Sequence, residues 1–502
     1  MNLAHLLDQS ATAYPDRIAF INAEQRVSYQ EFQQQSMVLA GGFKRLGIGK
    51  GDRVAIMLPN TLLFPSLVYA IWRLGAQLVT VNPLMKSQEV EYIIKDSEAS
   101  VLVTLGALAD VLDLPDYQGS WVVVGETSRE AVPYAQLFQA PPVIQPEPLE
   151  ADDVVAVIYT SGTTGRPKGA MLTSRNLDFD SAVAREAIKV SEDDRFYCVL
   201  PLFHIYALNV ALLVSVRSGA SVFLEPRFVP HVTLKHLKEF ECNIFLGVPA
   251  LFGALLAASG EGNLQKLRCC ISGSAPLTVS VLKQFEEKFQ TIILEGDGPT
   301  ECSPITTFNP IDGSRKVGSI GLPLSGIEIA IVDPDTDEFM PIGEVGELVV
   351  KGENVFKGYL NQPEETAKVL KNGWYHTGDL GSVDEDGYFY IVDRLKDLII
   401  VGGMNVYARE VEEIIHQYPA VTACSVVGEY DALRGEIVHA FVEVKENKDS
   451  LERDLIKFTR EKLADYKCPR KVTVLEQLPR SLTGKILKRT LKEGMKGYSL
   501  KD

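Results

Sequence analysis

The first third of the chain alternates between short apolar runs and amphipathic stretches. Residues 28–47 begin with Ser28 and Glu31 in the spacing of a capping box and continue amphipathically, which predicts a helix. Residues 52–58 and 77–81 are largely apolar and are predicted to be strands, with a helical stretch between them. Strand–helix–strand repetition predicts parallel sheets with helices on their faces.

The pattern changes three times further along the chain. Residues 139–153, rich in proline and acid, predict a linker to the next block, which opens with an apolar strand at 154–159. Around residues 321–379 the runs become short strands and turns, which predicts a β-rich segment. From about residue 393 strands and helices alternate again, and this predicts a small separate domain of about 110 residues.

Composition narrows the class of protein. The chain has 502 residues, which suggests two or more domains, and its net charge of −16 argues against nucleic-acid binding by bulk electrostatics. The seven cysteines show no C-x-x-C spacing and the histidines no H-E-x-x-H pair, so a disulfide framework or zinc site is not expected, and a cytoplasmic location fits.

The sequence argues against secretion and against a membrane-spanning helix, but it does not decide whether the protein contacts a membrane surface. The N-terminus lacks a basic segment followed by an apolar core, so a secretory signal is not expected. The apolar run at residues 207–216 is too short to span a bilayer, which takes about 20 residues. Peripheral membrane contact stays open.

Four polar stretches are candidates for chemistry. The loop 160–169 combines glycines and hydroxyls with Lys168, which suits polyphosphate, although its spacing is not that of a Walker loop. Lys485 follows a glycine in a basic tail, Asp379 follows Thr377 and Gly378, and Arg394 begins a charged stretch at the expected domain boundary. Each has a plain alternative: a surface loop, a solvated tail, a turn aspartate and a solvated linker.

An acidic stretch, EGDGPTECSP, follows the apolar run at 291–294. The apolar residues predict a short buried strand, and the glycines and proline predict a sharp turn directly after it. The turn carries three carboxylates, at Glu295, Asp297 and Glu301.

The order of these motifs is more informative than any one of them. The chain contains, in sequence, YTSGTTGRPKGAML, PLFH, GDGPTE, GELVVKG, YHTGDLG, DRLKD, GGMNVYAREVE and PRSLTGK. This series resembles the adenylate-forming family of acyl-CoA synthetases, peptide-synthetase adenylation domains and beetle luciferases, over essentially the whole chain. The resemblance implies an α/β fold with a large N-terminal domain (1–393) of two parallel αβ sheet subdomains and a β-rich subdomain. A hinge (394–397) and a small, mobile α+β C-terminal domain (398–502) follow.

The resemblance also implies a two-step reaction and its residues. A carboxylate attacks the α-phosphate of Mg-ATP to give an acyl-adenylate and pyrophosphate, and a thiol then takes the acyl group and releases AMP. Lys485, His204 and Glu301 are the expected catalytic residues, and Thr160 and Glu301 the expected neighbours of Mg²⁺. The expected ATP-binding set is Thr160, Ser161, Gly162, Thr163, Thr164, Gly165, Lys168, Gly273, Ser274, Ala275, Pro276, Glu295, Gly296, Asp297, Thr300, Asp379, Arg394, Lys396 and Lys485.

Roles within that set follow the family pattern. Lys485 is expected to contact the substrate carboxylate and the phosphates, while Asp379 takes the ribose hydroxyls with help from Arg394. Lys396 is the expected hinge, about which the small domain swings so that Lys485 leaves and the GGMN segment lines the path of the thiol. His204 also reads as a core histidine. The expected acyl and coenzyme A set is His204, Gly247, Val248, Pro249, Gly402 and Gly403.

The acid is expected to be a fatty acid, because PLFHIYALNVALL and GVPALFGALL resemble bacterial fatty-acyl-CoA synthetases more than other members. The alkyl chain would run along Ile205, Leu208, Val248, Leu251 and Phe252, which read equally as core. Free coenzyme A is the favoured acceptor, and a homodimer would match relatives. Alternatives are an aromatic or short dicarboxylic acid, a carrier protein as acceptor, and a nucleotide-binding module without catalysis.

Asp297 departs from the family pattern, which has an aromatic residue here that stacks on adenine. A carboxylate cannot stack. It can accept a hydrogen bond from the adenine amine or cap its own turn, and the sequence does not favour either.

Overall fold

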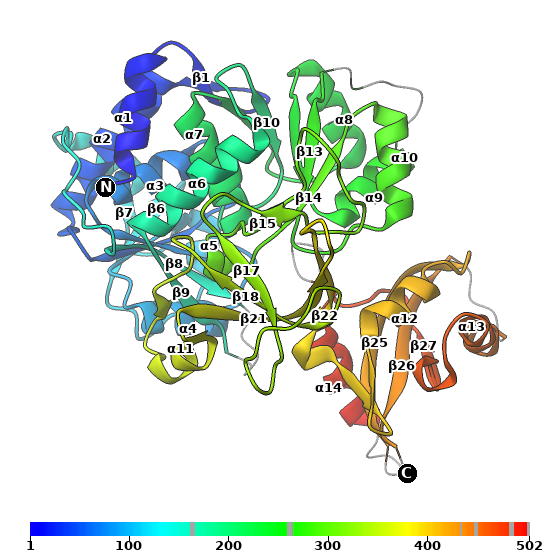
Figure 1. Ribbon diagram of the computed structural model, residues 1–502. Coiled ribbons are helices and arrows are strands. Elements are labelled where there is room, and N and C mark those ends of the chain that lie inside the picture. Colours follow the sequence, from blue (N-terminus) through cyan, green and yellow to red (C-terminus); the bar gives the residue numbers. More distant parts are fainter. Residues whose placement is uncertain are drawn as a thin grey trace.

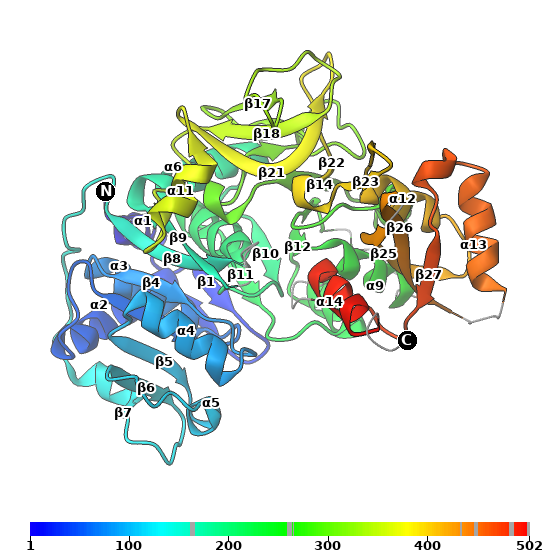
Figure 2. The same cartoon turned by 90° about the horizontal axis from the view of Figure 1, so that it is seen from below.

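The computed structural model describes residues 1–160, 166–258, 264, 266–431, 434–445, 450–480 and 486–498, with side chains described up to residue 494. A large part, coloured blue to yellow in Figure 1, carries a smaller part in orange and red beyond β22 (Phe389–Arg394). Figure 2 shows that the strands of the large part are grouped into separate sheets.

The first sheet has eight strands in the order β19-β9-β8-β4-β3-β5-β6-β7. Strands β8, β4, β3, β5 and β6 run parallel, whereas β9 and β19 add antiparallel at one edge. Its strands are β3 (Arg53–Met57), β4 (Gln77–Thr80), β5 (Val101–Leu105), β6 (Ser120–Val124), β7 (Val132–Pro133), β8 (Val154–Thr160), β9 (Lys168–Thr173) and β19 (Gly358–Tyr359). The connecting helices are α2 (Tyr29–Arg45), α3 (Leu63–Arg73), α4 (Ser87–Ser97), α5 (Gly106–Val111), η1 (Tyr134–Gln139) and α6 (Ser174–Ile188).

The second sheet has nine strands in the order β16-β15-β14-β13-β12-β10-β11-β1-β2, and the six from β14 to β1 are parallel. Its strands are β1 (Ile18–Ile21), β2 (Arg26–Ser28), β10 (Arg195–Cys198), β11 (Ser221–Leu224), β12 (Ile244–Gly247), β13 (Cys269–Ser272), β14 (Ile293–Asp297), β15 (Thr307–Phe308) and β16 (Leu322–Pro323). Its helices are α1 (Ala4–Ala13), the π-helix η2 (Ala207–Leu213), α7 (Val214–Ser218), α8 (Pro230–Glu239), α9 (Pro249–Ala258), α10 (Val279–Phe289) and η3 (Thr300–Cys302).

The third sheet is antiparallel and forms the β-rich segment. It consists of β17 (Glu328–Val332), β18 (Gly346–Lys351), β20 (Leu370–Lys371), β21 (Trp374–Val383) and β22, with α11 (Pro363–Val369) beside it. The smaller part consists of β23 (Ile399–Val401), β24 (Met404–Val406), α12 (Ala408–Ile415), β25 (Val421–Asp431), β26 (Gly435–Val444), α13 (Leu451–Arg460), η5 (Asp465–Lys467), β27 (Lys471–Val474) and α14 (Lys488–Tyr498).

The first two sheets share one hydrophobic core. Ile56 on β3 and Leu246 on β12 belong to the same buried cluster as Trp72 on α3 and Val210 on the π-helix. The capping box predicted at the start of α2 is present, since the Glu31 carboxylate accepts from the Ser28 N–H at 2.8 Å and the Ser28 hydroxyl accepts from the Glu31 N–H at 3.2 Å. The α/β fold with a β-rich segment and a small C-terminal α+β part is confirmed.

The proline-rich segment 139–153 does not separate two sheets. Strand β8 follows it and pairs with β4, so the strands on both sides of the segment belong to one sheet. The segment is also tied down, because the N–H of Val143 donates to Met37 and that of Glu147 donates to Arg73. It connects two parts of the same sheet and is not a linker between domains.

The short helix η4 (Leu395–Asp397) lies between β22 and β23, where the hinge is predicted. The division at 393 and 398 stays a prediction. Among the residues that the structure describes, no helix combines the length and apolar character that a bilayer crossing requires.

Candidate active site

The carboxyl ends of β12, β13 and β14 bring three predicted segments to one edge of the second sheet. Gly247 pairs with Ser272, and Ser272 pairs with Glu295. The segments that follow these strands, Val248–Pro249 and Gly273–Pro276, therefore begin side by side. In open parallel sheets this edge is the usual place for a ligand.

The His204 segment packs over that edge. The Tyr206 hydroxyl donates to the carbonyl of Ile271 at 3.0 Å, and its ring lies 3.5 Å from where a Cβ on Gly273 would stand. Half-buried His204 accepts a hydrogen bond at Nδ1 from the Tyr206 N–H at 3.3 Å. The π-helix begins directly after it, and such turns occur often at functional sites.

The acidic stretch begins as strand rather than turn. The sequence predicts that the strand ends at Leu294, but β14 continues to Asp297 because Gly296 and Asp297 pair with Phe308 and Thr307 of β15. A Cβ at position 296 would lie 2.5 Å from the Phe308 ring, so this pairing requires glycine. The turn comes after Asp297, whose carbonyl accepts from the N–H and hydroxyl of Thr306.

Glu295 is a carboxyl group in an environment that disfavours its charge. Burial raises its pKa to about 7. Hydrogen bonds from the backbone N–H groups of Leu277 and Gly318 lower the pKa, but their effect is smaller than that of burial. At neutral pH this group is partly protonated, unlike an ordinary glutamate.

Glu295 should therefore make stability depend on pH. The folded protein holds this proton more tightly than the unfolded chain, so the free energy of unfolding falls as pH rises from about 4.5 to about 7. Glutamine does not titrate, so the free energy of unfolding of Glu295→Gln should rise relative to that of the wild type over this pH range, by at most about 3 kcal/mol. Urea unfolding at pH 5 and pH 8 measures it. Glu287→Gln, at an exposed position of α10, is the matched control, and an equal pH response of both variants would contradict the assignment.

Glu301 lies in η3, 8% exposed. Its Oε1 accepts a hydrogen bond from the Tyr359 hydroxyl at 2.7 Å, and its carbonyl accepts from the Phe356 N–H at 2.8 Å. Tyr359 lies on β19, which pairs with β9, and Lys168 of β9 pairs in turn with Thr160 of β8. The two predicted metal neighbours, Thr160 and Glu301, thus lie on connected elements.

These residues fit a magnesium ion bound together with nucleotide. A glutamate carboxylate and a threonine hydroxyl are hard oxygen donors, and Mg²⁺ is usually held by one or two carboxylates plus substrate phosphates. Within residues 1–160, 166–258, 264, 266–431, 434–445, 450–480 and 486–498, no group of three or more His, Cys, Asp or Glu side chains could hold a metal alone.

Lys168, predicted to bind phosphate, has partners within the protein. Its ammonium lies 2.5 Å from a carboxylate oxygen of Glu365 on α11 and 5.0 Å from the centre of the Tyr359 ring. Lys168 lowers the pKa of Glu365 to about 2, with Lys368 adding to the effect. The predicted phosphate-binding residues Ser161, Gly162, Thr163, Thr164 and Gly165 lie outside the described residues, as does Lys485.

Asp379 and Arg394, predicted for the ribose, face each other across β21 and β22, with Nε and Oδ1 3.0 Å apart. Asp379 raises the pKa of the Arg394 guanidinium, and Asp397 and Asp297 add to the rise. The unusual Asp297 is therefore near enough to act on the same arginine. Asp379 lies within β21 rather than in a turn, next to an irregularity in the pairing of β21 with β18. Glu347 holds this part of the strand, because it accepts from the Gly378 N–H at 2.9 Å and pairs with His376 at 2.8 Å.

The smaller part of the chain meets the large part at β22. Asp393 accepts from the backbone N–H of Arg409 in the first turn of α12 at 3.2 Å, and the Arg409 guanidinium donates to the carbonyl of Ile391. Lys396 follows three residues after Asp393 and is exposed, and desolvation nevertheless lowers its pKa, with Arg394 adding to the effect.

Gly402 and Gly403 are exposed at the β23–β24 turn with φ of +59° and +82°. Val401 and Met404 pair on either side, so the turn takes two residues and requires positive φ at both. In this structure the turn faces solvent.

The predicted alkyl-chain residues are mostly packed core. Ile205, Leu208, Val248 and Phe252 are each at most 4% exposed. Phe252 packs edge-on against Phe245 and Phe285, with ring centres 5.5 Å and 5.1 Å away. Leu251, half-buried, contacts two core clusters. The core reading thus describes most of this set, and a role at the acyl chain stays a prediction.

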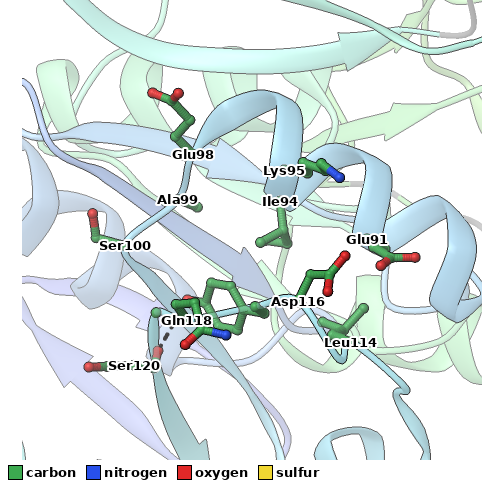
Figure 3. Close-up of a pocket in the computed structure, with 12 residues that line it drawn as sticks. Glu91, Ile94, Lys95, Glu98, Ala99, Ser100, Leu114, Asp116, Gln118 and Ser120 are labelled. Atoms are coloured by element: carbon green, nitrogen blue, oxygen red, sulfur yellow. Dashed lines mark hydrogen bonds between the residues drawn. The ribbon is translucent and has the colours of Figure 1, made fainter.

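A surface cavity of about 480 Å³ lies apart from these residues, between α4, the start of β5 and the segment before β6. Figure 3 shows Ile94 and Leu114 facing it, with the charged side chains of Glu91, Lys95, Glu98 and Asp116 around its rim. No predicted site residue lines it.

Sequence reasoning missed several residues that organise the site: Tyr206, Glu347, Tyr359, Asp393 and Arg409. Each contacts a predicted residue or a predicted segment. A lone tyrosine in an apolar stretch reads as core, so Tyr206 and Tyr359 carry no sequence signal of their own. The first acidic residue of DRLKD, Asp393, was visible as part of a motif but not as a partner of α12.

Two family models match the chain. That for AMP-binding enzymes matches residues 7–360, and that for the C-terminal domain of AMP-binding enzymes matches residues 410–485. A long-chain-fatty-acid–CoA ligase of Bacillus subtilis is 34% identical, over 98% of this chain and 94% of the relative. A feruloyl-CoA synthase of Amycolatopsis is 34% identical, over 92% of both chains.

Solved structures agree in fold. The crystal structure of ATP-bound MatB from Rhodopseudomonas palustris has a TM-score of 0.92 and 32% identity, over 99% of this chain and 100% of that one. The o-succinylbenzoate coenzyme A synthetase of Bacillus subtilis, in complex with ATP and magnesium ion, has a TM-score of 0.87 and 32% identity, over 97% of this chain and 99% of that one.

Proposed function

The chain belongs to the family of AMP-binding enzymes, and we propose that it is an AMP-forming ligase that joins a carboxylic acid to coenzyme A. The observation that carries the proposal is the assembly at one edge of the second sheet. There the Gly273 and Gly296 backbones and the Glu301 carboxylate come from the second sheet and its connections, and the Asp379–Arg394 pair, on which Asp297 acts, comes from the third sheet. Such convergence of polar groups from distant segments is expected of an active site.

In the first half-reaction an anionic carboxylate must approach a polyanionic nucleotide. Alignment of the two reactants and neutralisation of charge supply most of the rate acceleration in phosphoryl chemistry. Thr160 and Glu301 are proposed to hold Mg²⁺, which when bound neutralises phosphate charge. Lys485 is proposed to add a positive charge, and the Asp379 carboxylate to accept hydrogen bonds from the ribose.

The second half-reaction is proposed to use a different orientation of the small part of the chain. Rotation about Lys396 would withdraw Lys485 and bring the Gly402–Gly403 turn toward the thiol. The solvent exposure of both glycines in that turn supports this proposal. One site would then serve two steps by rigid-body motion.

The proposed acid is a fatty acid. The full-length similarity to a long-chain-fatty-acid–CoA ligase supports it. Equal similarity to a feruloyl-CoA synthase keeps an aromatic acid as the second candidate. AMP release that depends on coenzyme A, measured with straight-chain acids of two to eighteen carbons and with aromatic and dicarboxylic acids, separates them. Activity confined to aromatic or dicarboxylic acids would overturn the fatty-acid assignment.

The acceptor and the occurrence of catalysis are tested in the same assay. Replacing coenzyme A by a phosphopantetheinyl carrier protein tests the acyl-loading alternative, and higher turnover with the carrier would favour it. Absence of acid-dependent pyrophosphate exchange with every acid would favour a nucleotide-binding module without catalysis.

Asp297 provides a prediction specific to this chain. Since a carboxylate cannot stack on adenine, ATP is proposed to be held more by phosphate and ribose contacts than by the base. We expect Asp297→Tyr to lower KM for ATP several-fold, because base stacking on an aromatic side chain contributes about 1–3 kcal/mol in single-strand binding proteins. Initial rates at varied ATP measure it, with KM for the acid as internal control. An unchanged KM for ATP would contradict the idea.

A further inference from the structure

Tyr359 makes a direct contact with the carboxylate assigned to the metal. Its hydroxyl donates to Glu301 Oε1 at 2.7 Å, and the two side chains are 7% and 8% exposed. The bond engages one of the two carboxylate oxygens. A buried hydrogen bond to a charged acceptor is strong and directional, so it restricts the orientation of the carboxylate.

Tyr359 is itself held on several sides. Its backbone pairs with Ala170 of β9, and its N–H donates to the Thr366 hydroxyl at 2.9 Å. The ring packs edge-on against Phe356, with centres 4.9 Å apart. The Lys168 ammonium lies over the ring, and the Glu365 carboxylate fixes Lys168 in that place.

Tyr375 on β21 supports the same hydroxyl. Burial raises the pKa of Tyr359, the Glu301 carboxylate adds to the rise, and a hydrogen bond from Tyr375 opposes it. The Tyr375 ring packs against Phe356 with centres 5.5 Å apart. Tyr375 also lies four positions before Asp379 on β21, so the strand that carries the carboxylate proposed for the ribose contributes to this cluster.

We propose that Tyr359 is a positioning residue that presents the Glu301 carboxylate to the metal, and that Lys168 acts through Tyr359 rather than on phosphate. The inference rests on the proposed function only in taking Glu301 as a metal ligand. Partners that orient a ligating carboxylate typically change metal affinity by about 10–100-fold when they are removed.

The test compares two tyrosine hydroxyls. Tyr359→Phe removes the bond to Glu301 and keeps the ring. Tyr29→Phe is the matched control, because the Tyr29 hydroxyl donates to Ala220 at 2.6 Å in a fully buried place away from the site. Mn²⁺ binding in the presence of a non-hydrolysable ATP analogue, followed by electron paramagnetic resonance, reports metal affinity without turnover.

Tyr359→Phe is expected to weaken Mn²⁺ binding by about 10–100-fold, while Tyr29→Phe leaves it within about twofold of the wild type. Equal Mn²⁺ affinity in Tyr359→Phe and the wild type would reduce Tyr359 to a core residue and overturn the proposal. So would a wild-type protein that binds no Mn²⁺ with the analogue. Failure of every acid in the AMP-release assay would instead reject the ligase function and leave this comparison intact.

Glu365→Gln tests the part assigned to Lys168. The variant removes the ionic partner that fixes the ammonium over the Tyr359 ring and touches neither Tyr359 nor Glu301. A smaller loss of Mn²⁺ affinity in the same direction is expected. A loss in Glu365→Gln without one in Tyr359→Phe would place Lys168 at the metal or the phosphates directly and overturn the proposal.

Discussion

Lys485→Ala is expected to nearly abolish formation of the acyl-adenylate and to leave thioester formation from supplied acyl-adenylate largely intact. The first step brings a carboxylate onto a phosphate, and a positive charge placed at the developing negative charge contributes about 10²–10³ in rate. The second step transfers the acyl group from AMP to a thiol, releases AMP and, in the proposed mechanism, takes place with Lys485 withdrawn. Pyrophosphate exchange measures the first step, and AMP release from synthetic acyl-adenylate plus coenzyme A measures the second.

Lys471→Ala is the control for this variant. Lys471 lies on β27 in the same small part of the chain, half of its side chain is exposed, and it pairs only at the surface with Glu429 at 2.5 Å. Both half-reactions should be unchanged in it, since exposed ion pairs contribute little. An equal fall of both half-reactions in Lys485→Ala would reject the proposed division of labour between two orientations.

Glu301→Gln has the second largest expected effect. The glutamine carbonyl can still accept the bond from Tyr359 and the side-chain volume is kept, so the fold should be preserved. The variant removes one negative charge at the assigned metal site, and we expect adenylate formation to fall by about 10²–10³, as when a single stabilising group is lost from a preorganised site. Pyrophosphate exchange at varied Mg²⁺ measures it.

Glu301→Ala completes the comparison. It also leaves the buried Tyr359 hydroxyl without its acceptor, so it should lower the free energy of unfolding by about 1–3 kcal/mol, whereas Glu301→Gln should not. Thermal unfolding in the absence of nucleotide separates these effects. Wild-type exchange rates in Glu301→Gln would remove Glu301 from the metal site.

The local elements were predictable because they depend on nearby residues. The capping box of Ser28 and Glu31 and the apolar run at 154–159 specify their helix and strand within a few positions. The end of β14 was not, because it depends on β15, which pairs with it from ten residues downstream. The prediction that segment 139–153 is a linker between two blocks failed for the same reason, since strand β8 after it returns to pair with β4.

The candidate site likewise contains residues that the sequence predicts and partners that it does not predict. Family resemblance predicts Glu301, Asp379 and Arg394 as site residues, and the pairing of β21 with β22 places the last two together. The partners of those residues come from far along the chain. Tyr359 is 58 residues from Glu301, and Glu365 is 197 residues from Lys168. Periodicity and local spacing carry no information about such pairs, and the sequence therefore predicts a phosphate role for Lys168 without indicating its partner Glu365.

The contact between β22 and α12 affects how often the small part of the chain occupies the observed orientation and how often it occupies the rotated one. In the orientation observed here, the Asp393 carboxylate and the Arg409 guanidinium each make a hydrogen bond across the junction. A hydrogen bond to a charged group contributes about 1.5–3 kcal/mol, so losing one to water on rotation would disfavour the rotated conformer about 10–100-fold. In the proposed mechanism, coenzyme A must then bind the rotated conformer more tightly by at least that factor to populate it, and its apparent affinity measures the bias that these two side chains impose.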